Sequence, residues 1–446
     1  MAVSGDMIGS ALVRISSQQA TAWIFRVLAW ASFVWMLGGK ACALLLLAAL
    51  VTQAVARILH ACRAQVTTAR VVLALAVAGH VLLLASSGRA ALWPFALPVG
   101  MGVFMCHAVS YLMDVHRGLV DPRDDLTAMM YLVQLPVFPA GPLSRFHEFR
   151  QQLRHTDVTM AGFSYGIRRI VTGVIKVLLV AGPLQATADQ IFALRVTRLS
   201  IDTAWLGAAC ASLDVYFWVS GFSDVGIGLG RILGFRYQEN FRRPFTADSI
   251  REFWRRWNVT LMTWLRDYLS LPSAGHDRPT FRLFLATVAG LLIVGAWQHA
   301  TLHVLPWSLY FATWLAVEAL GFGAVLRRVP RSVRHVYVLV IVMFGWMLLH
   351  ASGPGPLLGY TEALLGFSVM KFGASSVYFT WGFTTAFVSA IIFAGPMVGN
   401  ISRWRVSVDA ATASLIMMLA ATGVLMWHAV TGLRRLVSPD DVSRSR

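Results

Sequence analysis

The feature that most constrains the fold of this chain is a series of apolar stretches, each long enough to cross a lipid bilayer. A membrane helix needs about 20 predominantly apolar residues, and a helix satisfies every backbone polar group within its own segment. We therefore expect an all-α polytopic membrane protein with about eleven transmembrane helices. The expected spans are approximately 20–37, 41–58, 70–86, 92–112, 159–183, 200–218, 285–304, 306–326, 335–351, 376–398 and 410–430.

Two shorter apolar pieces, 127–141 and 357–370, are expected to be re-entrant or interfacial segments. Such segments are tolerated at membrane depth where they pack against protein or line a cavity. The stretch 20–37 has no clear small-residue cleavage site, so we expect a membrane helix there rather than a removable signal peptide. No linker separates domains, and we expect residues 1–446 to form a single membrane domain.

The charge of the chain is basic but sparse. Only 13% of the residues are charged, while 57% are hydrophobic and the formal net charge is +17. Soluble domains carry roughly 25% charged residues, so too few are present to cover a soluble surface. The Lys and Arg residues lie mostly between apolar spans, where cytoplasmic loops and anionic lipid headgroups account for them. We expect membrane lipids as partners and no nucleic acid.

A polar, tryptophan-rich segment, 249–269, interrupts this apolar pattern. On a continuous helix Phe253, Trp257, Leu261 and Trp264 would share one face. One interpretation is an interfacial amphipathic helix with a tryptophan belt and snorkelling arginines. The other is a helix that lines a cavity, where Asn258 offers a hydrogen-bonding group and arginines bind an anionic donor such as the pyrophosphate of coenzyme A.

The expected span 285–304 is almost wholly apolar but contains His299. A buried neutral imidazole is a good general base for a hydroxyl nucleophile, and a histidine bonded to neighbouring backbone is the alternative. His303 follows one helical turn later, but no carboxylate lies nearby in the sequence to complete a metal site. We therefore expect no metal and leave the base and core interpretations of His299 open.

Three blocks of sequence resemble the membrane-bound O-acyltransferase superfamily. The longest, which we call the signature segment, is 220–269, "SGFSDVGIGLGRILGFRYQENFRRPFTADSIREFWRRWNVTLMTWLRDYL". It is most similar to the bacterial branch that includes alginate O-acetylation and teichoic-acid D-alanylation proteins. "VSYLMDVHRG" (109–118) with "FPAGPLSRFHEF" (138–149) resembles the upstream motif of that branch, and "VMFGWMLLHASGPGPLLGYTEALLGF" (342–367) resembles its late tryptophan-containing helix.

The resemblance implies a helical bundle around a central tunnel and transfer of an acyl group from a thioester to a hydroxyl. It also implies an essential histidine on the helix 285–304 and a polar partner, His, Asn or Asp, in the signature segment. In this chain these positions are His299 and Asn258. The remaining expected substrate-binding or tunnel residues are Trp254, Trp257, Arg255, Arg256, Trp264, Arg266 and Gln298.

Two positions depart from the family pattern. Bacterial relatives usually have His where this chain has Asn258, and the usual Trp-His-Gly reads Trp297-Gln298-His299-Ala300. Alignment on Gly295-Ala296-x-x-His299 keeps the histidine, whereas alignment on Trp297 replaces it by Gln298. A further histidine that is frequent in the bacterial branch is Phe311 here, which favours a degenerate protein.

The leading hypothesis is a bacterial inner-membrane O-acyltransferase that modifies a cell-envelope polysaccharide or another exported hydroxyl acceptor. The donor would be acetyl-CoA, with no bound cofactor. The first alternative donor is a carrier-protein thioester, for example D-alanyl. The second alternative is a non-catalytic scaffold or acyl channel. The expected protein partners are a periplasmic acyltransferase or hydrolase-like protein, or a small carrier protein.

Overall fold

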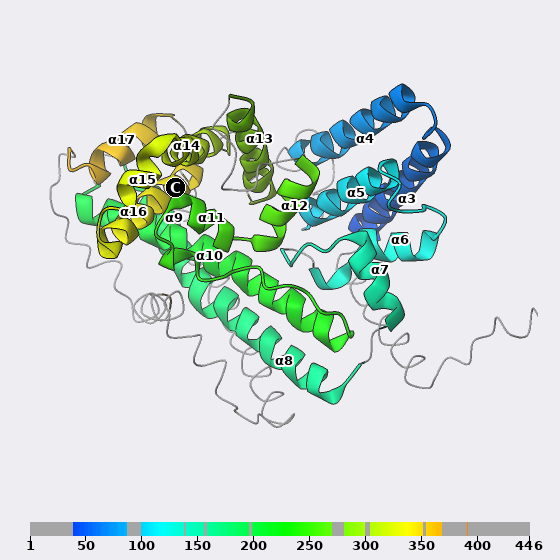
Figure 1. Ribbon diagram of the computed structural model, residues 1–446. Helices are drawn as coiled ribbons and strands as arrows, with labels where there is room; N and C mark the ends of the chain where they lie inside the picture. The colour runs from blue at the N-terminus through cyan, green and yellow to red at the C-terminus, as the bar shows by residue number, and fades with distance from the viewer. Residues whose placement is uncertain are drawn as a thin grey trace, which may run out of the picture.

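The computed structural model describes residues 39–86, 100–137, 140–155, 158–195, 199–269, 281–298, 304–350, 354–367 and 390. Every secondary-structure element longer than an isolated bridge in these ranges is a helix. Figure 1 shows two groups of helices joined by a long antiparallel pair. The all-helical part of the sequence-based prediction is confirmed for this part of the chain.

The first group contains α3 (Gly39–Ala61), α4 (Val66–Ser86) and α5 (Met101–His116), which pack against one another. Two shorter helices, α6 (Asp125–Leu132) and α7 (Phe146–His155), close the group (Figure 1). Every side chain of α5 from Met101 to Leu112 is buried. The described part of the apolar stretch predicted over 92–112 is therefore a helix that other helices of the protein surround.

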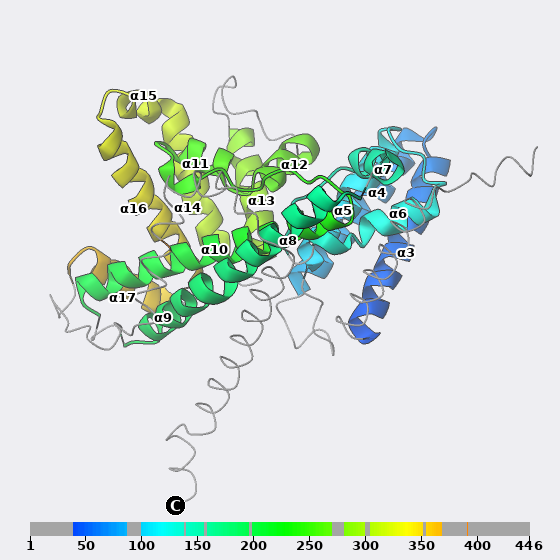
Figure 2. The same cartoon turned by 90° about the horizontal axis from the view of Figure 1, so that it is seen from below.

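The central pair consists of a bent helix and a long straight one. The bent helix runs through α8 (Met160–Ile175), a π-helical segment (Lys176–Ala181) and α9 (Gly182–Phe192). Beside it lies α10 (Ile201–Ile232), which continues well beyond the predicted span 200–218 (Figure 2). The two backbones approach closely at Gly166 and Gly228, because a Cβ atom on Gly228 would lie 2.6 Å from the Gly166 carbonyl oxygen.

The second group packs against the other end of α10 and contains the signature segment from α11 onward. Its helices are α11 (Ile250–Arg256), α12 (Val259–Leu269), α13 (Phe281–Gln298), α14 (Val304–Val317), a π-helical segment (Glu318–Phe322), α15 (Gly323–Leu326), α16 (Arg331–His350) and α17 (Pro354–Leu364). The apolar piece predicted over 357–370 thus begins inside the short helix α17.

Four of the described helices are long and apolar enough to cross a membrane. They are Cys42–Ala61, Met160–Phe192, Val304–Leu326 and Arg331–His350. Val66–His80 and Phe284–Gly295 are apolar but shorter. The expected spans 20–37, 376–398 and 410–430 lie outside the described residues. The number of about eleven transmembrane helices stays a prediction, while a multi-pass membrane protein is supported by these helices.

Candidate active site

The tryptophan-rich segment is not one helix. α11 ends at Arg256 and α12 begins at Val259, with Trp257 and Asn258 between them. Asn258 has a φ of 41°, in the left-handed region that Asn adopts more readily than most residues. The prediction of a single continuous face through Phe253, Trp257, Leu261 and Trp264 is therefore wrong. Because of the break, the end of α11 faces α14 and α16, whereas Trp264 of α12 faces α5.

The side chain of Asn240 holds the start of α12. Its Oδ1 accepts hydrogen bonds from the backbone N–H of Thr260 at 3.2 Å and from Thr260 Oγ1 at 2.8 Å. Its backbone carbonyl accepts the N–H of Val259 at 2.8 Å. The first N–H groups of a helix have no partner within the helix, so Asn240 satisfies two of them from a separate loop.

The start of α11 is held by a carboxylate from the second helical group. Glu318 accepts hydrogen bonds from the backbone N–H groups of Ile250 at 2.7 Å and Arg251 at 3.1 Å. The Tyr337 hydroxyl donates to the same carboxylate at 3.2 Å. A negative charge is favourable at a helix N-terminus, and Ser249 adds a side-chain cap by accepting from the N–H of Glu252 at 3.1 Å.

Buried aromatic rings fill the space between α11, α14 and α16. We call these six residues the aromatic cluster: Phe253, Trp254, Trp257, Trp307, Phe311 and Trp346. The ring centroids of Trp257 and Trp346 are 5.0 Å apart, and those of Trp254 and Phe311 are 5.1 Å apart. The indole nitrogens of all four tryptophans are buried and have no hydrogen-bond partner within the described ranges. The cluster thus brings donors into a largely apolar space.

The last turns of α13 lie directly against this cluster. A Cβ atom on Gly295 would lie 3.2 Å from the Trp307 ring and 2.6 Å from Val304 Cγ1. The helix ends at Gln298, immediately before His299. His299 and His303 lie outside the described residues, as do the side chains of Trp297 and Gln298. The structure therefore places the helix that leads to His299, and the role of His299 itself stays a prediction.

The break between α11 and α12 leaves the amide oxygen of Asn258 buried and without a partner among the described residues. Its side chain is 1% exposed, and its Oδ1 makes no hydrogen bond to any described residue. A buried polar atom without a partner costs about 1–3 kcal/mol, so it calls for an explanation, which can be an ordered water, a bound ligand or a catalytic role. Trp257, the preceding residue, belongs to the aromatic cluster.

The three predicted arginines lie in different surroundings. Arg256 pairs with Glu252 and donates to Thr246 Oγ1 at 2.6 Å, so it ties α11 to the loop before it. Arg266 donates to Thr263 Oγ1 at 2.9 Å, one turn back in α12. The Arg255 side chain is exposed. Arg256 and Arg266 therefore anchor their own segment.

Trp264 contacts the first helical group rather than the aromatic cluster. Its indole nitrogen donates to the carbonyl oxygen of Cys106 on α5 at 3.1 Å. Its ring packs on that of Tyr268 with a centroid distance of 5.4 Å. These contacts indicate that Trp264 holds α12 to α5. Because the helix is broken at Asn258, Trp264 faces α5 and not the aromatic cluster.

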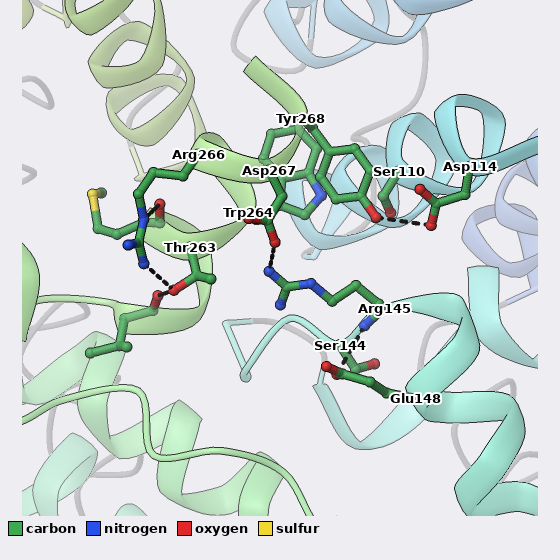
Figure 3. A network of polar contacts seen from close by, with 12 residues as sticks. Ser110, Asp114, Ser144, Arg145, Glu148, Thr263, Trp264, Arg266, Asp267 and Tyr268 are labelled. Carbon is green, nitrogen blue, oxygen red and sulfur yellow. Dashed lines mark hydrogen bonds and ion pairs between the residues drawn. The ribbon is translucent and has the colours of Figure 1, made fainter. Parts of the chain in front are cut away.

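The end of α12 is the meeting point of the upstream blocks (Figure 3). Asp267 pairs with Arg145 of the upstream block 138–149. The Tyr268 hydroxyl donates to the buried carboxylate of Asp114 at 2.9 Å. Burial raises the pKa of Asp114, against the effect of the Tyr268 hydroxyl. These contacts fix the C-terminal end of α12, whereas Asn240 holds its start.

Sequence reasoning missed Asn240 and Glu318. Asn240 lies inside the signature segment, but nothing in a local pattern tells a capping side chain from an ordinary loop residue. Glu318 lies within the predicted span 306–326, where a lone acidic residue is costly without a partner. That cost indicates that Glu318 has a polar partner, but it does not identify the N–H groups of α11 as that partner.

Comparison with known proteins places these features in a family. The family described as "MBOAT, membrane-bound O-acyltransferase family" matches residues 99–353. A probable alginate O-acetylase AlgI of Azotobacter vinelandii is 37% identical over 258 residues, which are 57% of this chain and 51% of that protein. A peptidoglycan O-acetyltransferase of Helicobacter pylori is 22% identical over 302 residues, 60% of this chain and 57% of the relative.

A teichoic acid D-alanyltransferase of Bacillus subtilis is 26% identical over 175 residues, covering 38% of this chain and 44% of that protein. The chain spans about half the length of the curated relatives it matches. The matched range 99–353 contains α5 to α16, the break at Asn258 and the aromatic cluster. This chain belongs to the membrane-bound O-acyltransferase family.

Proposed function

We propose that the protein is a bacterial inner-membrane O-acyltransferase that acetylates a hydroxyl group of a cell-envelope polysaccharide or another exported acceptor. The observation that supports it best is the buried, unpartnered amide oxygen of Asn258 on the turn between α11 and α12. Family membership and the O-acetylating relatives supply the reaction class. Membrane lipids surround the protein, and a periplasmic acyltransferase-like protein would pass the acetyl group onward.

In the proposed reaction the acceptor hydroxyl oxygen attacks the thioester carbonyl carbon. His299 takes the hydroxyl proton as the new C–O bond forms, and the proton then passes to the sulfur as the C–S bond breaks. The products are an ester and a free thiol. Asn258 turns its amide nitrogen toward the developing oxyanion, and one such donor is worth about 3 kcal/mol in acyl transfer.

The aromatic cluster serves this reaction by excluding water. A thioester hydrolyses if water reaches the carbonyl while the base is in place, and a closed apolar site suppresses that side reaction. Trp254 and Trp257 contribute to the cluster and are the proposed lining residues. Gln298, at the end of α13, is proposed as a further lining residue next to His299. Arg255 stays a candidate for binding the anionic part of the donor.

Acetyl-CoA is the preferred donor. The O-acetylating relatives are similar over a larger part of this chain than the D-alanyl relative is. An aminoacyl thioester on a small carrier protein is the alternative donor. A catalytically degenerate scaffold is the alternative from another class, and Phe311 favours it, because a fully buried phenyl ring occupies the position where bacterial relatives often have histidine.

The test compares His299→Ala with His303→Ala in cells that lack the native protein, at matched protein level. The expected result is loss of acetyl groups from the envelope polysaccharide with His299→Ala and retention with His303→Ala. The measurement is acetate released from isolated polysaccharide by mild base. Equal acetate from His299→Ala and the unchanged protein would contradict the assignment of the base and support the scaffold.

A further inference from the structure

Asn240 has an amide whose orientation is fixed by its partners. A backbone N–H can only donate, so the atom that faces Thr260 N must be the amide oxygen. Asn240 Oδ1 takes this position and also accepts from Thr260 Oγ1. Thr260 Oγ1 in turn accepts the backbone N–H of Leu143 at 3.0 Å. Thr260 therefore donates its hydroxyl hydrogen to Asn240, and Asn240 Nδ2 is the free end of the amide.

Nδ2 of Asn240 is a buried donor with no partner in the described part of the chain. The residue is 1% exposed, so bulk water does not reach Nδ2 to accept its hydrogen bond. The acceptor Oδ1 of Asn258 is unpartnered at the same turn, one residue before the helix that Asn240 caps. A donor and an acceptor without partners thus flank the N-terminus of α12.

We propose that Asn240 Nδ2 donates a hydrogen bond to the carbonyl oxygen of the acyl thioester and to the oxyanion that forms from it. The assignment rests on the proposed function. An unpartnered N–H requires an acceptor, and the positive end of the α12 dipole favours negative charge on that acceptor. The N–H proton stays on Asn240, since the acceptor hydroxyl loses its proton to His299 and the sulfur receives it. Asn240 is then a catalytic residue as well as the cap of α12.

The substitution Asn240→Asp separates the two roles. An ionised aspartate keeps an oxygen at the same place for the Thr260 N–H, but it has no hydrogen to donate. If Asn240 only caps α12, the variant keeps its activity. Under the proposal the rate falls about 100-fold, as for loss of one oxyanion donor. Asn240→Ser is the uncharged comparison, because serine lacks the amide hydrogen, although its shorter side chain also gives up the hydrogen bond to Thr260.

The assay is acetyl transfer from acetyl-CoA to envelope polysaccharide in isolated membranes, with the thermal unfolding midpoint measured in detergent. We expect both variants to lose kcat with KM for acetyl-CoA near that of the unchanged protein. Asn240→Asp is expected to keep the unfolding midpoint, and Asn240→Ser to lower it about as much as Thr260→Val does. Thr260→Val is the control for the cap: it removes the side-chain hydrogen bond to Asn240, so it lowers the midpoint and lowers kcat much less.

Asn240→Ser or Asn240→Asp with a kcat within about threefold of the unchanged protein would overturn the proposal, because a lost oxyanion donor costs far more. The base and the proposed function are judged separately, by His299→Ala and by membranes that lack the protein. An active unchanged protein with inactive His299→Ala and active Asn240→Ser rejects only the role of Asn240. Equal, measurable rates for the unchanged protein and His299→Ala reject His299 as the base. Transfer by the unchanged protein no faster than in membranes that lack it rejects the function itself.

Discussion

Asn258 shows how one backbone conformation limits the residue types at a functional position. Among residues other than glycine, Asn, Asp and His are enriched in the left-handed region, and Asn258 lies there with a φ of 41°. These are the same three types that the family resemblance gives for the polar partner in the signature segment. The change from the usual His to Asn therefore keeps both the turn and a hydrogen-bonding side chain.

Glu318 is the residue whose loss we expect to destabilise the site most directly. Glu318→Gln replaces one of the oxygens that accept from Ile250 and Arg251 by a group that cannot accept. We expect the free energy of unfolding to fall by about 1–2 kcal/mol, since a buried N–H is left without its partner. The measurement is the thermal unfolding midpoint in detergent. Glu362→Gln, an exposed carboxylate on α17, is the control and is expected to leave the midpoint unchanged.

At the scale of elements, the contact between α8 and α10 depends on the absence of side chains. Gly166 and Gly228 meet so closely that each would place a Cβ atom 2.6 Å from the other's carbonyl oxygen. Small residues of this kind allow membrane helices to approach one another. Asp224 of α10 adds polar contacts to the bent helix, because it pairs with Arg169 of α8 at 2.7 Å and with Lys176 of the π-helical segment at 2.6 Å.

Gly228→Ala tests this packing. A methyl group there would overlap the Gly166 backbone and Ile170, so we expect a lower unfolding midpoint and less folded protein in the membrane. Gly79→Ala on α4 is the matched substitution, because no atom lies within 4 Å of its Cβ position. Alanine is the better helix former by about 1 kcal/mol, so Gly79→Ala is expected to be neutral or stabilising. A stable Gly228→Ala protein would contradict the close packing of the pair.

The sequence predicts the helices better than their contacts, for a physical reason. The apolar stretches 41–58, 159–183, 306–326 and 335–351 predict described membrane-length helices, because apolar length is a local property. The break at Asn258 depends on Asn240 and Glu318, which approach only after folding, so the helical period alone predicts a continuous helix. The pairing of Asp267 with Arg145 also joins residues far apart in the sequence, so a local pattern does not predict it.

For the whole molecule, the basic loops predict which ends of the helices face the cytoplasm. α10 has 32 residues, which at 1.5 Å per residue is about 48 Å and longer than the ~30 Å hydrocarbon layer. The loop after it contains Arg236, Arg242 and Arg243, so the positive-inside rule places that loop in the cytoplasm. The helix Met160–Phe192 is long and apolar enough to cross a membrane, and it starts beside the end of α10 at Gly166 and Gly228. It ends at the loop before α10, so we predict that this loop faces the opposite side.

Cysteine labelling in intact cells checks this orientation. With the native cysteines replaced by alanine, a membrane-impermeant thiol reagent is expected to label Arg195→Cys and to leave Arg242→Cys unlabelled until the cells are permeabilised. Both positions are exposed on the described surface, so access to the reagent depends on the side of the membrane. Labelling of Arg242→Cys from outside would reverse the orientation and place the arginine-rich loop away from cytoplasmic acetyl-CoA.

The central claim is that the left-handed turn presents the Asn258 amide to the reacting acyl group, and Asn258→Gly tests it most directly. Glycine adopts a φ of 41° without strain, so the turn stays while the amide is lost. We predict that acetyl transfer in membranes falls about 100-fold at an unfolding midpoint close to that of the unchanged protein. Full acetyl transfer by the glycine variant would contradict the account, because the turn alone would then suffice.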